Sequence, residues 1–177
     1  RQQYYFDHEW FLETGETLPT YRPPLVVEDH PLQMVMGHAR HGVHSMWRDD
    51  PLLLSLQRGE PDIYIGVSDA EARGVEDGEL IRVFNPLGEF IAQAHVSAGL
   101  QPGMVFMYHG WDPVMFRGQQ NFSAVVSTAG LMKRTNLVGD YGHLKYRPLY
   151  YTPNQTYCDF TCDFEKYVEG AVQEEEI

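Results

Sequence analysis

The sequence predicts a mainly β fold, a closed or nearly closed barrel of about six strands with short helices and long loops. Short apolar segments recur along the chain and are separated by glycine or proline turns, which is the pattern of many short strands. Helix-capping signals are confined to two places, and each begins a short helix. The 177 residues suit one domain around a single core.

Residues 1–30 are expected to form a lead-in arm before the first strand. They are rich in tyrosine, proline and glutamate, and the prolines would interrupt a long helix. Because the chain begins at Arg1 rather than at methionine, we expect it to be a piece of a longer protein. Leu32–Met36 then predicts a buried strand that ends at Gly37 and leads into the polar cluster His38–Ser45.

The first helix is expected directly after this polar cluster. Asp49 or Asp50 can accept hydrogen bonds at its start, and Pro51 occupies its first position, where a missing N–H costs nothing. Leucines fill its interior, and Arg58-Gly59 would end it.

The second helix follows a short strand at Asp62–Gly66. Ser68–Glu71 has the form of a capping box, in which the serine and glutamate side chains satisfy free backbone N–H groups at the helix start. Gly74 is expected to end this helix, and Glu76–Gly78 to form a turn.

A hairpin and a further strand are expected next. The alternating segments Glu79–Asn85 and Glu89–Ser97 are joined by the tight connection Asn85–Gly88, where Gly88 would adopt a positive φ. After a turn at Gln101–Gly103, the segment Met104–His109 predicts another strand.

The remainder predicts a long excursion and one closing strand. Residues 110–156 hold only short apolar runs, so we expect loops that carry function rather than core. Tyr157–Val168 alternates as a half-buried strand does, with Cys158 and Cys162 on one face. Four residues of strand separate their Cα atoms by about 13 Å, too far for a disulfide. Residues 169–177 form an acidic tail.

The charge balance narrows the class of partner. A net charge of −12 argues against a nucleic-acid partner, and no apolar run approaches the length of a membrane span. The few cations gather in two segments, Arg40 with Arg48 and the residues around Lys133 and Lys145. Such local positive charge suits a small diphosphate, although for any single one of these cations solvated surface charge is the favoured interpretation.

The segment His38–Arg48 is the first candidate site. His41 and His44 have a spacing that zinc sites use, but the sequence offers no evident further ligand. Alternatively, imidazole, guanidinium and hydroxyl groups there converge on an anion or a heterocycle. An exposed polar loop without a ligand is the third interpretation, and the residues alone leave all three open.

Two further segments carry candidate chemistry. In Met107–Pro113, His109 and Asp112 could form a catalytic triad with the distant Ser45, but the sequence has no nucleophile elbow. In Thr135–Tyr146 the glycines permit close backbone approach to a ligand, and an asparagine amide can pair with a pterin or guanine edge. The chain has neither a glycine-rich phosphate-binding loop nor the dinucleotide fingerprint of ordinary nucleotide folds.

In their order along the chain, these segments resemble the molybdopterin dinucleotide-binding domain of the dimethyl sulfoxide reductase superfamily. The matching segments are Gly37–Arg40, His44–Asp49, Leu56–Pro61, Asp69–Gly74, Asp77-Gly78, Val83–Asn85, Gly88, Pro102-Gly103, Met107–Trp111, Asn136 and Gly142–Leu144. They indicate the branch that contains ethylbenzene dehydrogenase, respiratory nitrate reductase, selenate reductase and dimethyl sulfide dehydrogenase. Residues 117–133 match no pattern of the family.

The resemblance implies a double-psi β-barrel over residues 31–168 that holds bis-molybdopterin guanine dinucleotide, with molybdenum or tungsten as its metal. The cofactor-binding residues it implies are His38, Arg40, His44, Ser45, Met46, Trp47, His109, Asn136, His143 and Lys145. The partners it implies are the rest of a catalytic subunit and an iron–sulfur electron-transfer subunit. The branch favours a periplasmic location, with a cytoplasmic one left open.

The leading hypothesis is therefore a cofactor-holding domain of a molybdenum oxidoreductase, not expected to be catalytic as an isolated fragment. The metal would perform the redox chemistry, and the domain would place the cofactor between the substrate and the iron–sulfur centres. A stand-alone double-psi barrel that binds a partner protein is the alternative from another class, because fold alone does not decide function. A small zinc hydrolase built on the histidines is the third hypothesis.

Overall fold

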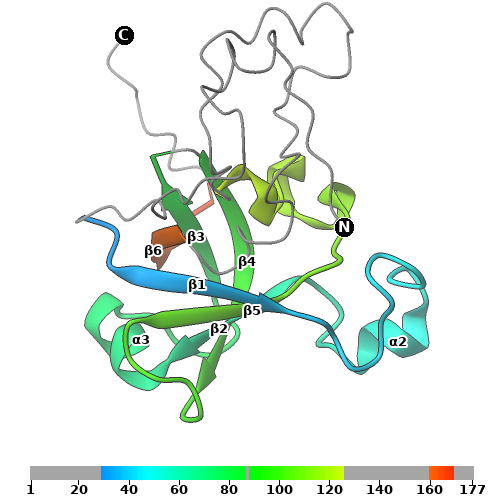
Figure 1. The fold of residues 1–177 in the computed structure, drawn as a ribbon, viewed down its shortest axis with the longest axis horizontal. Helices are drawn as coiled ribbons and strands as arrows, with labels where there is room; N and C mark the ends of the chain where they lie inside the picture. Colours follow the sequence, from blue (N-terminus) through cyan, green and yellow to red (C-terminus); the bar gives the residue numbers. More distant parts are fainter. Residues whose placement is uncertain (1–28, 87, 126–159, 170–177) are drawn as a thin grey trace, which may run out of the picture.

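The computed structural model describes residues 29–86, 88–125 and 160–169, and six of their segments close into one barrel (Figure 1). The strands are β1 Leu32–Gly37, β2 Asp62–Gly66, β3 Leu80–Asn85, β4 Gly88–Ser97, β5 Met104–Tyr108 and β6 Phe160–Lys166. The helices are α2 Pro51–Ser55 and α3 Val67–Arg73, with 3₁₀ helices at Pro113–Met115, Arg117–Gln119 and Phe122–Ala124. The predicted mainly β barrel with short helices is confirmed.

The strand order explains where the candidate loops meet. Around the barrel the order is β1-β5-β2-β4-β3-β6. β1 pairs with β5 and β2 with β4 in parallel, and all other neighbours are antiparallel. Two parallel pairs within an otherwise antiparallel closed barrel form the predicted double-psi arrangement. Because Gly37 is level with Tyr108, the chain leaves β1 and β5 at the same end of the barrel.

The core lies inside the barrel and follows from alternation along the strands. In β3, Ile81 and Val83 are buried, whereas Arg82 between them points outward and binds Glu89 and Glu165. The core also includes Leu32, Met34, Met36, Ile63, Ile65, Phe90, Ala92, Ala94, Val105, Met107, Phe160 and Phe164. Burying each large apolar side chain contributes about 1.5–3 kcal/mol, so the barrel does not depend on a ligand for its core.

Helix α2 begins as predicted. The Asp50 carboxylate accepts hydrogen bonds from the N–H groups of Leu52 and Leu53, and Pro51 occupies the first turn. The helix is shorter than expected, because its last regular residue is Ser55. The N–H of Gly59 still closes the turn on Leu54 O.

The capping box predicted at Ser68–Glu71 is wrong. β2 runs directly into α3, so Gly66 is the N-cap and no side chain caps the helix. Ser68 therefore already lies inside the first turn, and the Asp69 carboxylate accepts a hydrogen bond from Gly103 N at 2.8 Å. The end of the helix is as predicted, with Gly74 in the left-handed conformation.

The β3–β4 hairpin is confirmed, but the predicted positive φ at Gly88 is not. Gly88 is already the first residue of β4, in extended conformation. A Cβ at this position would lie 2.9 Å from the backbone oxygen of Ala124. Glycine is therefore required here for the close approach of another segment, not for its own backbone angles.

The described part of the expected excursion contributes to the core, which corrects the expectation of loops without core residues. Trp111, Phe116 and Val125 are buried against the barrel. Residues 126–159, including Cys158, lie outside the described residues. In β6, burial of Cys162 raises the pKa of its thiol to about 12, which agrees with the predicted core cysteine.

The predicted lead-in arm and acidic tail stay predictions, because residues 1–28 and 170–177 lie outside the described residues. Within the described ranges, neither helix has the length and apolar character that crossing a bilayer would need.

Candidate functional site

Three histidines converge where β1 and β5 end. His38 follows β1 and His109 follows β5, and the His109 N–H donates to Gly37 O at 2.9 Å. The parallel pairing of the two strands therefore places these imidazoles side by side. His44 reaches them from the loop after β1.

The rings are in mutual contact. The centroids of His38 and His109 are 4.3 Å apart, those of His38 and His44 are 5.0 Å apart, and those of His44 and His109 are 5.1 Å apart. One ring nitrogen from each can be chosen so that all three lie within 4.8 Å of one another. His38 and His44 are exposed, and His109 is half-buried. We call these three residues the histidine cluster.

The protonation of His109 is biased toward the neutral form. Desolvation by burial lowers its pKa first, and repulsion from His38, His44 and Arg48 lowers it further. A neutral imidazole carries one N–H donor and one acceptor nitrogen. The cluster can therefore both donate to and accept from one ligand.

The loop that carries His44 has an unusual backbone. His44 has a φ of 53° and Trp47 a φ of 61°, both in the left-handed region. Each such residue costs of order 1–3 kcal/mol, and the surrounding contacts must offset that cost. A bridge between Val43 and Met46 closes the turn, with Met46 N donating to Val43 O at 3.0 Å.

Gly110 lets the two loops touch. Its φ is 94°, and a Cβ at this position would lie only 2.2 Å from His44 O. No residue with a Cβ fits this contact without displacing the backbone. The glycine after His109 therefore permits the approach of the loop that carries His44.

Arg48 is a buried cation beneath the cluster. Its side chain is 2% exposed, and its guanidinium lies 4.3 Å from the centroid of the Trp111 ring. Desolvation lowers its pKa. Among the described residues no carboxylate forms an ion pair with Arg48, and the more distant charge of Asp62 only partly opposes the lowering of its pKa.

Trp111 supplies an unsatisfied hydrogen-bond donor. It is 2% exposed, and its indole Nε1 has no hydrogen-bond partner among the described residues. An unpaired buried donor costs about 1–3 kcal/mol, so a buried N–H with no protein partner marks a place for a ligand acceptor.

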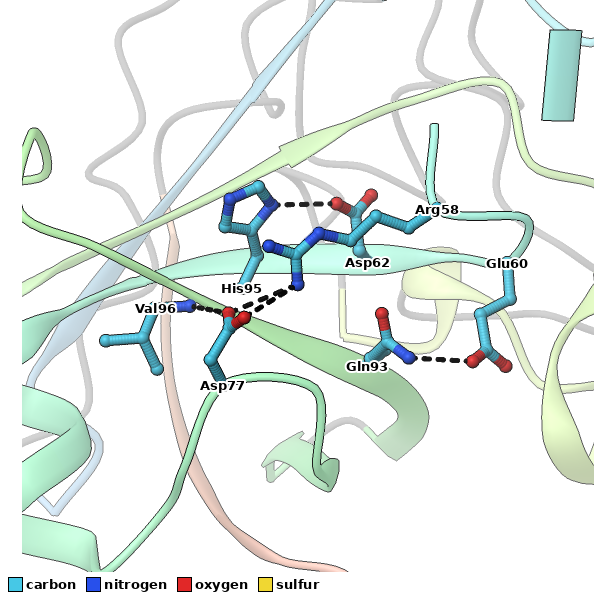
Figure 2. Close-up of polar contacts among 7 residues, drawn as sticks. All are labelled: Arg58, Glu60, Asp62, Asp77, Gln93, His95 and Val96. Carbon is cyan, nitrogen blue, oxygen red and sulfur yellow. Dashed lines mark hydrogen bonds and ion pairs between the residues drawn. The ribbon is translucent and has the colours of Figure 1, made fainter. Parts of the chain in front are cut away.

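A cavity of about 340 Å³ lies beside the same loop and is lined by Ala39, Arg40, His41, Leu56, Gln57, Arg58, Asp62, Tyr64, His95 and Tyr108. Figure 2 shows its polar wall, where His95 Nδ1 is 3.2 Å from the Asp62 carboxylate. The pKa of Asp62 is raised, because desolvation outweighs the hydrogen bond and charge of His95. We call the Asp62–His95 wall with Arg58 the paired wall.

The paired wall is satisfied from within the protein. Arg58 bridges to Asp77 at 3.1 Å, and the Asp77 carboxylate also accepts from Val96 N at 2.9 Å (Figure 2). Together these two contacts lower the pKa of Asp77, the bond from Arg58 being the larger cause. Donors and acceptors here are thus matched with each other.

The structure groups only part of the predicted site. His38, His44 and His109 come together, whereas Arg40 lines the cavity with His41. Ser45, Met46 and Trp47 lie on the exposed turn of the loop, where Trp47 is 59% exposed. Asn136, His143 and Lys145 lie outside the described residues.

Two sequence-based alternatives change with this geometry. The histidine pair considered for zinc, His41 with His44, is divided between the cavity and the cluster, and His44 instead meets His38 and His109. Asp112, the proposed acid of a triad, is the N-cap residue of the 3₁₀ helix at Pro113–Met115.

Sequence reasoning missed the roles of three residues. Arg48 was interpreted as a surface cation, but it is buried. Trp111 and Gly110 were recognised only as parts of a resemblance. The one available signal was the occurrence of glycine and tryptophan directly after a strand-ending histidine, which is unusual for a plain exposed loop.

Comparison with known proteins identifies relatives. A family model described as "Molydopterin dinucleotide binding domain" matches residues 32–135. The respiratory nitrate reductase subunit alpha of Haloferax mediterranei is 43% identical, over 94% of this chain and 17% of that protein. The perchlorate reductase subunit alpha of Dechloromonas aromatica is 37% identical, over 95% of this chain and 18% of that protein.

A solved structure shares the fold. Acetylene hydratase from Pelobacter acetylenicus superposes with a TM-score of 0.57 at 18% identity, over 85% of this chain and 21% of that one. The chain thus spans less than a fifth of the length of the two curated relatives.

Proposed function

Because the chain belongs to the molybdopterin dinucleotide-binding domain family, we propose that its histidine cluster holds the pterin part of that cofactor. The observation that carries the proposal is the convergence of three imidazoles from two loops at one end of the barrel. Pterin edges present alternating hydrogen-bond donors and acceptors, and neutral imidazoles can match both.

The residues present fit such a group on two further counts. The buried indole N–H of Trp111 lacks a partner among the described residues, and a ligand acceptor would satisfy it. The buried Arg48 guanidinium has no ion-pair partner among the described residues, so its positive charge would favour an anionic ligand such as a dinucleotide with its diphosphate. When bound, the cofactor supplies redox chemistry at its metal, and the residues of this chain bind and orient it.

Arg40 is suited to the phosphate part of the same ligand. It lies on the loop between His38 and His44, is exposed, and forms no ion pair within the described ranges. A guanidinium binds phosphate oxygens through two parallel hydrogen bonds. We propose that the cofactor is bis-molybdopterin guanine dinucleotide with molybdenum or tungsten. Asn136, His143 and Lys145 are its proposed further contacts.

The parent protein is proposed to be an oxidoreductase subunit that exchanges electrons with an iron–sulfur partner, as a catalytic alpha subunit would. The alternative of a stand-alone adaptor barrel accounts less well for a half-buried imidazole and a buried guanidinium that has no ion-pair partner among the described residues. The presence of an iron–sulfur cysteine motif in a continuous reading frame upstream would decide between the two.

A divalent metal ion is the second candidate ligand, because three ring nitrogens lie within 4.8 Å of one another. The nearby Arg48 charge opposes a bound cation, whereas it favours an anionic cofactor. Elemental analysis that found stoichiometric zinc lost on His38→Ala would favour the metal.

The proposed function is tested by the cofactor content of the cofactor-loaded protein. His44→Ala and His109→Ala should each reduce bound pterin about ten- to a hundredfold, the effect of losing a hydrogen bond of roughly 1.5–3 kcal/mol. His41→Ala is the matched control, because His41 lies on the same loop but lines the cavity. Equal losses in all three variants, or full pterin content in the first two, would contradict the assignment.

A further inference from the structure

Arg48 joins the two loops that carry the histidine cluster, and it binds their backbone. Its Nη2 donates to His109 O at 2.8 Å, and its Nε donates to His44 O at 3.3 Å. One carbonyl belongs to His44, on the loop after β1, and the other belongs to His109, directly after β5. One guanidinium therefore connects the residue after β5 to the turn after β1.

The guanidinium is itself held in one place. Its Nη1 donates to the Gln57 Oε1, and Gln57 Nε2 donates to Leu53 O at 3.2 Å. The Trp111 ring covers it at 4.3 Å, and the side chain is 2% exposed. A buried side chain with three hydrogen-bond directions and one stacked face has little rotamer freedom.

The planar fork explains why arginine is suited to this position. A guanidinium has five N–H donors in fixed directions, so three acceptors can be bound at once in one plane. A lysine ammonium carries charge but cannot span the same carbonyls with a fixed geometry. The guanidinium donates to carbonyl and amide oxygens, so Arg48 does not act as a member of an ion pair in the described structure.

We propose that Arg48 is a positioning residue, which holds His44 against His109 so that both imidazoles reach the same ligand. The inference rests on the proposed function only for the identity of that ligand. The positioning itself concerns two loops of this chain and can be measured without the ligand.

The His38–His109 pair is an internal control for the positioning role of Arg48. His38 and His109 are brought together by the β1–β5 pairing and the His109 N to Gly37 O bond, which do not involve Arg48. His44 is brought to His109 by the loop that Arg48 binds. Loss of Arg48 should therefore separate His44 from the other two rings and leave His38 beside His109.

The test is nuclear magnetic resonance of the 177-residue chain as wild type, Arg48→Lys, Arg48→Met and the control Arg58→Met. Wild type should show ring-to-ring Overhauser effects for all three histidine pairs. Both Arg48 variants should lose those of His44 by at least fivefold and keep the His38–His109 effect. Arg58→Met should match wild type, because Arg58 is ion-paired away from the cluster. Retention of the His44 effects in folded Arg48→Lys would overturn the proposal.

The titration of His109 in the same samples separates positioning from charge. If the loop opens, water enters and the His109 pKa rises in both Arg48 variants, because burial is the main cause of its lowered value. A rise in the methionine variant alone would show a purely electrostatic role and would overturn the proposal. If Arg48→Met does not fold, the His44 Overhauser effects of Arg48→Lys still test the positioning role.

Cofactor content distinguishes this inference from the proposed function. Arg48→Lys in the cofactor-loaded protein should lower pterin content about as much as His44→Ala does. Pterin loss with unchanged His44 Overhauser effects would mean direct contact with the cofactor and would overturn the positioning role. If the Arg48 variants lose the His44 Overhauser effects but every histidine variant keeps normal pterin content, the proposed function is contradicted and the positioning role is supported.

Discussion

The histidine cluster lies on the loops after β1 and β5, and the paired wall lies on β2, β4 and the loop before β2. The polar groups of the two sites are satisfied in different ways. In the paired wall, Asp62 meets His95 and Arg58 meets Asp77, so each charge has a partner of opposite sign. Beside the cluster, Arg48 is buried without an ion-pair partner, and the Trp111 indole N–H has no hydrogen-bond partner, in the described part of the chain.

This difference supports the proposal that the ligand binds at the cluster rather than at the paired wall. Buried polar groups are almost always satisfied in folded proteins, and an exception usually marks a functional site. The paired wall can be explained as structure, since its interactions tie the segment before β2 to the turn before β3 and to β4. Beside the cluster, the described contacts leave the Trp111 indole N–H unpaired, and an acceptor group of the proposed cofactor would satisfy it.

The largest effect is expected from Gly110→Ala, which should destabilise the chain by about 3 kcal/mol, through a strained positive φ and a clash. A Cβ there would lie 2.2 Å from His44 O and would separate the two loops of the cluster. Urea unfolding measures the loss. Gly99→Ala is the control, because its nearest neighbour would be Ser97 Oγ at 3.6 Å and its φ is not positive. Equal stability of the two variants would show that the loops do not touch as described.

A smaller effect is expected from Asp62→Asn in the paired wall. The pKa of Asp62 is raised in the folded state, so its contribution to stability is complete below its unfolded pKa and is lost as pH rises through the folded pKa. The variant should therefore flatten the fall in unfolding free energy above about pH 4, by no more than about 1 kcal/mol at pH 7. Thermal unfolding across pH 4–8 measures this, and a steeper fall in the variant would contradict the raised pKa.

Arg58→Ala should change stability less, by about 0.5 kcal/mol, because its ion pair with Asp77 is largely solvated. The loss should shrink in high salt. Pterin content should remain at the wild-type level in the cofactor-loaded protein. A marked loss of cofactor in this variant would show that the paired wall binds the cofactor and would contradict its purely structural role.

No effect is expected from exhaustive chelation of metal ions. The apolar core closes without any metal ligand, so the cooperative unfolding transition of the chain should keep its midpoint. Scanning calorimetry before and after chelation measures it. A midpoint lowered by chelation and restored by zinc would favour a structural metal at the three imidazoles.

The barrel was predictable from the sequence because its signals are local. Alternation in β3 and the Asp50 cap of α2 depend on neighbours a few residues away. The capping box failed for a related reason, since Ser68 and Glu71 have the right spacing but β2 continues straight into α3. Gly88 was recognised as a required glycine, but its cause lies in Ala124, which a local pattern cannot show.

The site was only half predictable because it depends on strand order. His38 and His109 are neighbours through the parallel β1–β5 pair, which no spacing in the sequence indicates. The family resemblance nevertheless included both histidines among the predicted cofactor-binding residues. The separation of Arg40 from the histidines, and the burial of Arg48, depend on which side of the loop faces the barrel.

The most direct measurement is histidine modification by diethyl pyrocarbonate, mapped residue by residue in the chain with and without bound molybdopterin dinucleotide. His38, His41 and His44 are all exposed, so each should react in the cofactor-free chain. Bound cofactor should protect His38 and His44 at least fivefold and leave His41 reactive. Protection of His41 with unprotected His38 and His44 would contradict the account, because the pterin would then not contact the cluster.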